Sequence, residues 1–264
     1  MTKKILIIFI FLVLLNSCDD PFLPGYLDGA QIKPKDIGGL IFWVKADEGA
    51  LTGSSGNCTS DITPANNGDP VTCWKDLSGN GNHLEGAVGT SPIKITQYSD
   101  FNGKDAAYFS NAHAKASPVA NKVIPIHSTV FIVTKTISTS GQMLTFLLDG
   151  QTIEHRYIIS GGQHNFYVIG PNITSYTQRD IGSKLLLTGY ADGTSIKTYV
   201  NGKTGSVENA VFINEYKQIR IGDAALYEGY IAEVLIYDHP LSDLQIKEVE
   251  AYLAYRYDIE YEGD

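Results

Sequence analysis

The sequence lacks any run or local concentration of basic residues. Its 264 residues include 20 lysines and arginines against 29 aspartates and glutamates, and the formal net charge is −9. Sites for nucleic acids or anionic lipid headgroups need a basic patch, because the phosphates must be neutralised. The composition therefore excludes nucleic acid as a partner.

No apolar run is long enough to cross a membrane. The run over residues 5–15 follows Lys3 and Lys4 and is the length of an export signal, too short for a spanning helix. The next residues, Leu15-Asn16-Ser17-Cys18, resemble a bacterial lipobox. We therefore expect cleavage before Cys18 and lipid attachment to it. A plain secretory signal with an incidental cysteine is the alternative.

The amino-terminal region divides into two segments ahead of the body of the chain. Residues 1–17 are predicted to be the signal peptide, and residues 18–36, rich in proline and glycine, a flexible tether. Because several acyl chains hold a protein stably at a membrane, we expect a protein anchored in the bacterial cell envelope. Its place would be extracytoplasmic, at the outer membrane or the cell surface.

The chain has only three cysteines, which limits the roles that they can have. If Cys18 carries lipid, only Cys58 and Cys73 remain, both in a polar segment of an exported chain. A disulfide forms and persists in that environment, so we predict the pair Cys58–Cys73. The alternative, a metal-binding pair, lacks neighbouring histidine or cysteine ligands.

Familiar catalytic and metal-binding motifs are missing. The sequence has no closely spaced carboxylates of the Glu-x-Asp-x-x-Glu kind, no Gly-x-Ser-x-Gly and no His-Glu-x-x-His. It has no dense cluster of aspartate and asparagine that meets the coordination of calcium, although calcium stays open as a ligand. These absences favour binding over catalysis.

Helical periodicity is also missing before residue 243, whereas short apolar segments separated by turn residues are frequent. This spacing is typical of a β-sandwich. The expected strands cover residues 40–44, 71–75, 106–110, 129–137, 142–148, 155–160, 165–169, 184–190, 195–200 and 218–222.

The segment 228–257 organises the rest of the chain. Residues 230–237 are apolar on both sides, which predicts a strand inside a sheet covered on both faces, with Glu233 partly buried and satisfied by hydrogen bonds or a basic partner. Ser242 and Gln245 then form a capping box. The short helix that follows buries a stripe of Ile246, Val249, Tyr252 and Leu253.

Several segments together are similar to a known family. They are Gly39-Leu-Ile-Phe-Trp-Val-Lys-Ala-Asp-Glu-Gly49, Trp74-Lys-Asp-Leu-Ser-Gly-Asn-Gly-Asn-His83, Tyr199-Val-Asn-Gly-Lys203 and the strand-Pro-Leu-Ser-helix ending. Over residues 38–259 the chain resembles bacterial concanavalin A-like (LamG-type) domains. The resemblance implies an all-β fold, a two-sheet antiparallel jelly-roll sandwich with one short C-terminal helix, formed by residues 37–264. It says little about the ligand, because this fold serves lectins, adhesion modules and glycanases.

Two segments are candidates for ligand contact. The turn 76–83 is either a ligand or cation loop or, as we favour, a turn that satisfies its own hydrogen bonds. The second candidate surrounds Gly161-Gly162, where aromatic and polar side chains suit sugar rings: Tyr157, Gln163, His164, Tyr167 and Tyr176.

The sequence thus predicts a lipid-anchored envelope protein that recognises a carbohydrate or glycoprotein. The alternatives are a glycoside hydrolase or lyase with an atypical active site, and a purely structural envelope protein.

Overall fold

The computed structural model describes most of the chain from residue 32 onward. The described residues are 32–54, 58–59, 61–86, 91–110, 112, 114–116, 127–147, 153–160, 163–168, 173–178, 181–209, 218–222 and 227–263. The predicted signal peptide, most of the tether and Cys18 lie outside them.

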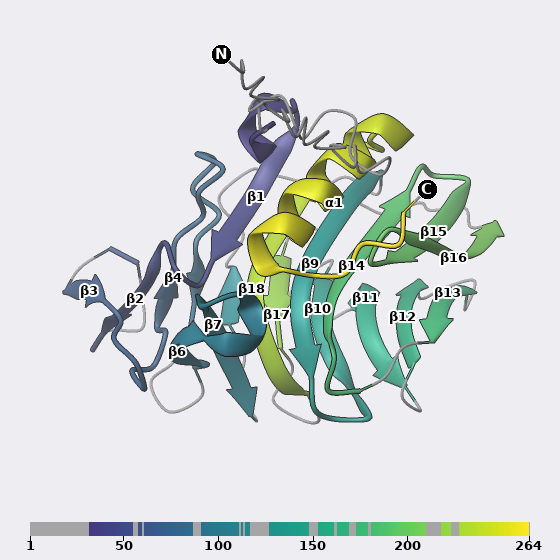
Figure 1. The fold of residues 1–264 in the computed structure, drawn as a ribbon. Coiled ribbons are helices and arrows are strands. Elements are labelled where there is room, and N and C mark those ends of the chain that lie inside the picture. Colours follow the sequence, from purple (N-terminus) through teal and green to yellow (C-terminus); the bar gives the residue numbers. More distant parts are fainter. Residues whose placement is uncertain are drawn as a thin grey trace, which may run out of the picture.

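The strands form two antiparallel sheets that pack face to face (Figure 1). Sheet A has the order β16 (Lys203–Asn209), β15 (Ser195–Val200), β14 (Lys184–Ala191), β9 (Ser128–Thr136), β18 (Glu228–Tyr237), β7 (Lys104–Ser110) and β6 (Ile93–Tyr98), with β1 (Leu40–Lys45) also paired to β18. Sheet B has the order β13 (Ile173–Gln178), β12 (Gln163–Val168), β11 (Ile153–Ser160), β10 (Ser140–Leu147), β17 (Gln218–Ile221), β8 (Ala114–Ala116), β5 (Leu84–Glu85), β4 (Cys73–Trp74), β2 (Ala50–Gly53) and β3 (Ile62–Pro64). The predicted all-β jelly-roll sandwich is confirmed.

Strand β18 lies inside sheet A and is covered on both faces, as its sequence predicts. Ile231, Val234 and Ile236 belong to the core between the sheets, whereas Leu235 and Tyr237 belong to a second cluster on the outer face of sheet A. Strict alternation over residues 230–237 predicts Ile231 and Leu235 on one face of the sheet, and this detail is wrong, because the two residues lie in different clusters. The register against β9 shifts between Ile231 and Glu233, and the bulge turns the strand by one residue.

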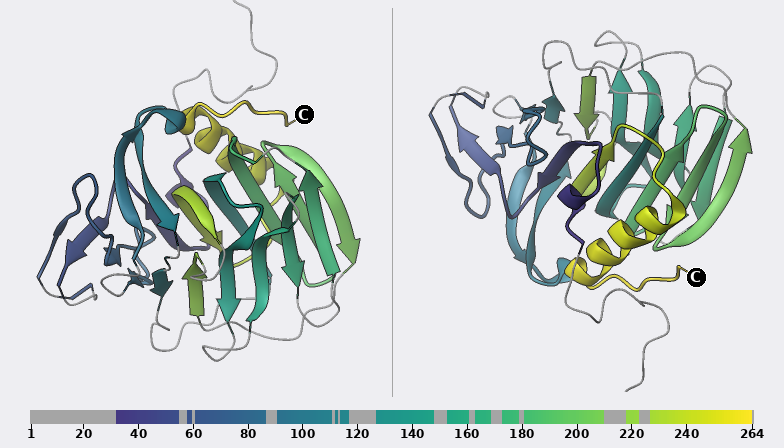
Figure 2. Two further views of the ribbon diagram at one scale, coloured as in Figure 1. Left: turned by 90° about the horizontal axis from the view of Figure 1, so that it is seen from below. Right: turned by 90° about the horizontal axis from the view of Figure 1, so that it is seen from above.

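The C-terminal helix α1 (Asp243–Tyr257) covers the outer face of sheet A (Figures 1 and 2). Ser242 caps its first turn and forms the predicted capping box with Gln245. Three residues of the predicted stripe, Ile246, Val249 and Leu253, are buried, and Tyr252 is half-buried against the same cluster. The molecule therefore has three layers, with sheet A in the middle. None of the helices that the structure describes is long and apolar enough to span a membrane.

The segment between the first strand and Trp74 contains more structure than its polar composition indicates. The predicted loop of residues 49–69 includes the short strands β2 and β3, which extend the end of sheet B. Cys58 and Cys73 form the predicted disulfide. Trp74 is fully buried, and its indole Nε1 donates to the Lys45 carbonyl over 2.7 Å.

Two further short elements adjoin the sheets. The 3₁₀ helix η1 (Pro34–Asp36) lies within the predicted tether, yet Pro34 is buried and its carbonyl accepts a hydrogen bond from the Tyr237 hydroxyl over 3.0 Å. Residues 34–36 therefore pack with the domain. The second, η2 (Ser99–Phe101), joins β6 to β7.

The hairpins of sheet A follow their turn residues. β14 and β15 pair as predicted across Asp192-Gly193. At the next reversal Asn201 and Gly202 both have positive φ, at 51° and 85°, which is the geometry of a type I′ turn. Strands β5, β6, β8, β13 and β16 lie outside the expected strand set, and β6, β13 and β16 are edge strands of their sheets along the main pairing order.

Candidate functional site

The residues predicted to bind a ligand around Gly161-Gly162 lie in β11, β12 and β13. His164 is buried between the sheets, where its Nε2 is 3.2 Å from the Thr136 hydroxyl. Burial disfavours the charged imidazolium and lowers the pKa of His164 to about 4. His164 thus faces the interior of the sandwich. The side chains of Tyr157, Gln163, Tyr167 and Tyr176 lie outside the described part of the structure, and their role stays a prediction.

The turn 76–83 satisfies its own hydrogen bonds. One Asp76 carboxylate oxygen accepts from the Trp43 and Ser78 amides, each over 2.9 Å, and the other accepts from the Asn82 amide. The Asn80 and Asn82 side chains donate to the carbonyls of Leu40 and Ile41. These residues fasten the turn to β1, which supports the structural interpretation over a ligand loop.

Glu233 was predicted to be partly buried and is completely buried beneath α1. Its partners are the hydrogen-bond donors and the basic residue that the sequence predicts. It accepts from Trp43 Nε1 over 2.6 Å and from the Tyr257 hydroxyl over 2.7 Å. Arg256 Nε lies 3.3 Å away, and the same guanidinium pairs with Asp47. Desolvation nevertheless raises the pKa of Glu233 to about 7. This network joins β1, β18 and α1 and has a structural role.

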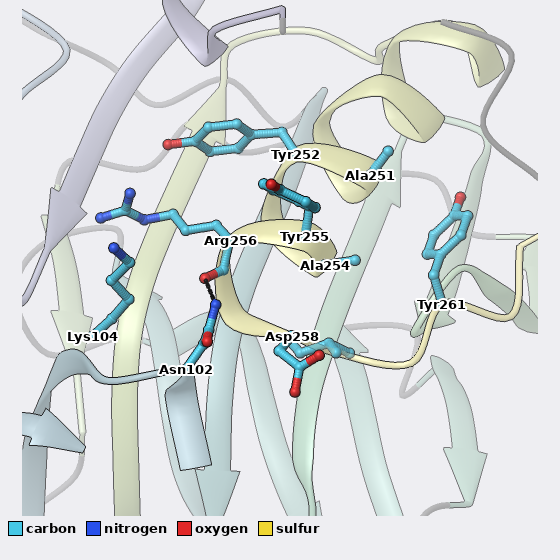
Figure 3. A pocket seen from close by; sticks show the side chains of 10 residues that line it. Asn102, Lys104, Ala251, Tyr252, Ala254, Tyr255, Arg256, Asp258 and Tyr261 are labelled. Atoms are coloured by element: carbon cyan, nitrogen blue, oxygen red, sulfur yellow. Dashed lines mark hydrogen bonds between the residues drawn. The ribbon is translucent and has the colours of Figure 1, made fainter. Parts of the chain in front are cut away.

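A groove lies beside the C-terminal half of α1 (Figure 3). We call it the tyrosine groove, and its volume is about 490 Å³. Its walls come from α1, the segment after α1 and the turn that leads into β7. The lining residues are Asn102, Lys104, Ala251, Tyr252, Ala254, Tyr255, Arg256, Asp258, Ile259 and Tyr261.

Three tyrosines line this groove and provide its aromatic surface. Tyr255 is 65% exposed, whereas Tyr252 and Tyr261 are half-buried. Burial raises the pKa of Tyr252 and Tyr261 above the usual value, so both hydroxyls stay neutral. The Tyr261 hydroxyl donates to Glu250. An aromatic face beside a polar hydroxyl suits a sugar ring, which also has apolar and polar sides.

Polar groups lie around the rings. Figure 3 shows Tyr252, Tyr255 and Arg256 projecting from α1 and Lys104 extending from the neighbouring segment. Asn102 Nδ2 donates to the Arg256 carbonyl over 3.3 Å, which fixes this wall to the last turn of α1. Asp258 pairs with Lys184 over 3.1 Å. The groove thus combines hydrogen-bond donors and acceptors with exposed ring surface.

Sequence reasoning missed this site for a clear reason. Tyr252 was assigned only to the packed stripe of the helix, and Tyr255 and Tyr261 were not singled out. The available signal was Tyr255 itself, because a large aromatic residue off the buried stripe of an amphipathic helix is directed to solvent. Asn102 and Lys104, which line the same groove, come from a turn distant in sequence, and helical periodicity does not reveal this neighbourhood.

A second groove runs between α1 and the β15–β16 hairpin, with a volume of about 660 Å³. Its described lining combines Lys197, Lys203 and Lys247 with Asp243, Glu250 and Glu262. Glu250 is buried, accepts from the Thr188 hydroxyl over 2.6 Å and from the Tyr261 hydroxyl over 3.1 Å, and burial raises its pKa to about 7. The charges of this groove largely balance, and it has fewer exposed rings.

Within the described ranges, no group of three or more histidine, cysteine, aspartate or glutamate side chains could hold a metal ion.

Comparisons with known proteins find likeness in structure alone. No protein-family model and no curated protein sequence matches the chain. Trypanosoma rangeli sialidase in complex with sialic acid superimposes with a TM-score of 0.55 at 14% identity, covering 86% of this chain and 34% of the sialidase chain. Domain 4 of AbnA, a GH43 extracellular arabinanase from Geobacillus stearothermophilus in complex with arabinotriose, also gives 0.55 at 14% identity, covering 80% and 98%.

The botulinum neurotoxin type G receptor binding domain gives a TM-score of 0.51 at 12% identity, covering 81% of this chain and 51% of that chain. The chain therefore spans about a third of the sialidase and half of the toxin fragment. At these identities the likeness is one of fold: the chain is an antiparallel β-sandwich of the kind that these proteins contain.

Proposed function

We propose that this protein binds carbohydrate and that the tyrosine groove receives the sugar. The observation that carries the proposal is the gathering of Tyr252, Tyr255 and Tyr261 around one open groove with polar neighbours. Two proteins of similar fold were solved with sugars, sialic acid and arabinotriose. These structural similarities support carbohydrate as the class of ligand, and the particular sugar has to be identified by experiment.

The composition of the groove favours binding over cleavage. Glycoside hydrolases generally use two carboxyl groups that flank the scissile bond. Asp258 is the only carboxylate among the groove residues that the structure describes, and it is paired with Lys184. We therefore expect no release of reducing sugars from bound polysaccharides.

The test is sugar binding by the purified protein, screened on a glycan array and quantified by calorimetry. Tyr255→Ala should weaken binding about tenfold, because a stacking face and its buried area are lost. Leu244→Ala is the matched control, since Leu244 is equally exposed, at 67%, on the same helix but outside the groove. Equal affinity for the two variants would contradict the assignment of the groove, and failure to bind any glycan would contradict the function.

We also propose that the protein is lipid-anchored in the bacterial cell envelope, through Cys18. The support is the leader sequence, with Lys3, Lys4 and the apolar run of residues 5–15 before Leu15-Asn16-Ser17-Cys18. Labelled palmitate should be incorporated into the wild-type protein and not into Cys18→Ser, which should leave the membrane fraction. A labelled Cys18→Ser variant would exclude this attachment site.

A further inference from the structure

Strand register aligns basic residues across the middle of sheet B. Thr145 in β10 pairs with Arg156 of β11 on one side and with Arg220 of β17 on the other, and Arg220 pairs with Lys115 of β8. Residues directly opposite each other in an antiparallel ladder share a face of the sheet. These four positions therefore form one row, which we call the basic row.

The basic row lies on the face of sheet B turned away from the core. Leu144 and Phe146, the two neighbours of Thr145, both belong to the core between the sheets, and so do Ile219 and Ile221 on either side of Arg220. Since successive residues of a strand point to opposite faces, Thr145 and Arg220 are on the outer face. Helix α1 covers the other sheet (Figure 2).

The basic row favours an anionic partner. Like charges at adjacent positions of a ladder are destabilising, and Arg220 and Lys115 are directly opposite. Glu85 lies opposite Lys115 in the strand register, at the end of the row. The chain has more acidic than basic residues, with a net charge of −9, so its composition does not predict a row of basic residues.

Two polar atoms near the row are also left without partners. Arg220 Nε and Gln142 Oε1 are both buried and make no hydrogen bond within the described part of the chain. Gln142 precedes two core residues, Met143 and Leu144, at a bulge in β10, which puts it on the same face as Thr145. One atom is a donor and the other an acceptor, and leaving either unsatisfied is costly.

We propose that this outer face of β17, β10 and β11 is a second binding site, for glycans that carry carboxylate groups. A carboxylate supplies the acceptor that an arginine prefers, and a sugar hydroxyl supplies the donor that Gln142 lacks. The site is separate from the tyrosine groove, so the two assignments stand or fall independently.

The experiment measures binding of polygalacturonate and alginate to the intact protein. The methyl ester of polygalacturonate serves as the neutral ligand with the same ring. At least one uronate should bind, more weakly as ionic strength rises, and the ester should bind at least about tenfold more weakly. Failure of both uronates, or equal affinity for acid and ester, would overturn the proposal.

Variants of Arg220 and Gln142 test whether the uronate binds at these residues. Arg220→Gln should weaken uronate binding about tenfold, and Arg220→Lys should recover only part of it, because lysine lacks the planar fork. If Arg220→Gln proves unstable, Gln142→Glu is the alternative variant: it adds an anion to the same face of the sheet and should abolish uronate binding. Lys203→Gln, an exposed lysine of sheet A, is the matched control and should bind as the wild type does.

Two further measurements separate this site from the tyrosine groove and from nonspecific attraction of anions. Tyr255→Ala should keep its uronate affinity, whereas Arg220→Gln should keep its affinity for a neutral sugar in the tyrosine groove. Dextran sulfate and duplex DNA should bind more weakly than the uronate. Equal affinity for all polyanions would show a nonspecific electrostatic surface and would overturn the assignment.

Discussion

At the scale of single residues, two buried carboxylates decide how stability depends on pH. Glu233 and Glu250 both have pKa values raised to about 7 by desolvation, but their surroundings differ. Glu233 has Arg256 nearby, whereas Glu250 is held by two hydroxyl groups. The consequences of replacing them therefore differ as well.

Glu250→Gln should stabilise the protein at pH 8. The pKa of Glu250 rises from 4.5 in the unfolded chain to about 7 in the folded protein, so the folded state binds more protons between these values. Its contribution to stability is fully present below pH 4.5 and is lost as pH rises through 7. Urea unfolding at pH 5 and pH 8 should show a gain of about 1 kcal/mol or more at pH 8 and a smaller difference between the two pH values than in the wild type. An equal effect at both pH values would contradict the assigned pKa.

Arg256→Met should destabilise the protein by about 3 kcal/mol, because it leaves Glu233 and Asp47 without the cation between them. The loss should be larger at pH 8 than at pH 5, where Glu233 is protonated. Lys184→Met is the control: it removes a surface pair with Asp258, which is 79% exposed, and should cost less than about 1 kcal/mol. Similar losses for both variants would argue against the buried network.

At the scale of elements, α1 and β18 form the framework on which the tyrosine groove is built. β18 supplies two buried faces, and α1 covers the outer one. The groove side of the same helix then carries Tyr252, which is half-buried, and Tyr255, which is exposed. Packing fixes the direction of these rings, because the buried stripe of α1 fixes the rotation of the helix.

The N-terminal cap of α1 should contribute to the stability of the protein. Ser242 Oγ accepts from the Gln245 amide over 3.3 Å, and the Gln245 side chain accepts from the Ser242 amide over 3.0 Å. Ser242→Ala should lower the free energy of unfolding by about 1 kcal/mol, whereas Ser242→Asp, which keeps an acceptor, should be nearly neutral. Chemical denaturation compares them, and identical losses would exclude a capping role.

The disulfide Cys58–Cys73 should stabilise the end of sheet B that holds β2, β3 and β4. It closes a loop with a sequence separation of 15, which corresponds to about 3 kcal/mol in the chain-entropy model. Replacing both cysteines with serine should lower the melting temperature, and reductant should lower that of the wild type alone. An unchanged melting temperature after verified reduction would contradict this contribution.

At the scale of the whole molecule, three layers leave two surfaces for ligands: the α1 side of sheet A, with its groove, and the outer face of sheet B, with the basic row. The turn 76–83 should not bind calcium, because both carboxylate oxygens of Asp76 already accept hydrogen bonds from backbone amides. The melting temperature should be the same with calcium and with a chelator; a rise of several degrees with calcium would reveal a site elsewhere.

Local pattern was sufficient for most of the fold. Alternating apolar residues, turn dipeptides and the capping box gave most strands, the helix and the doubly covered β18, because each depends on neighbours in sequence. The short strands β2 and β3 were missed, since residues 49–69 are polar and their strands depend on pairing with β4 and on the disulfide. The bulge that moved Ile231 was missed because it arises between strands, where a one-residue shift is invisible in either sequence.

The amino-acid sequence alone sets the β-sandwich and its elements, the disulfide and the buried acid at position 233. Where a ligand could be held depends on the tertiary structure. Lys115, Arg156 and Arg220 are separated by tens of residues and form no basic run in the sequence, yet pairing with β10 and β17 aligns them. Tyr252 and Tyr261 likewise meet Asn102 only because the turn before β7 lies against the end of α1. A binding surface depends on contacts between segments that are distant in the sequence, and composition contains no information about these contacts.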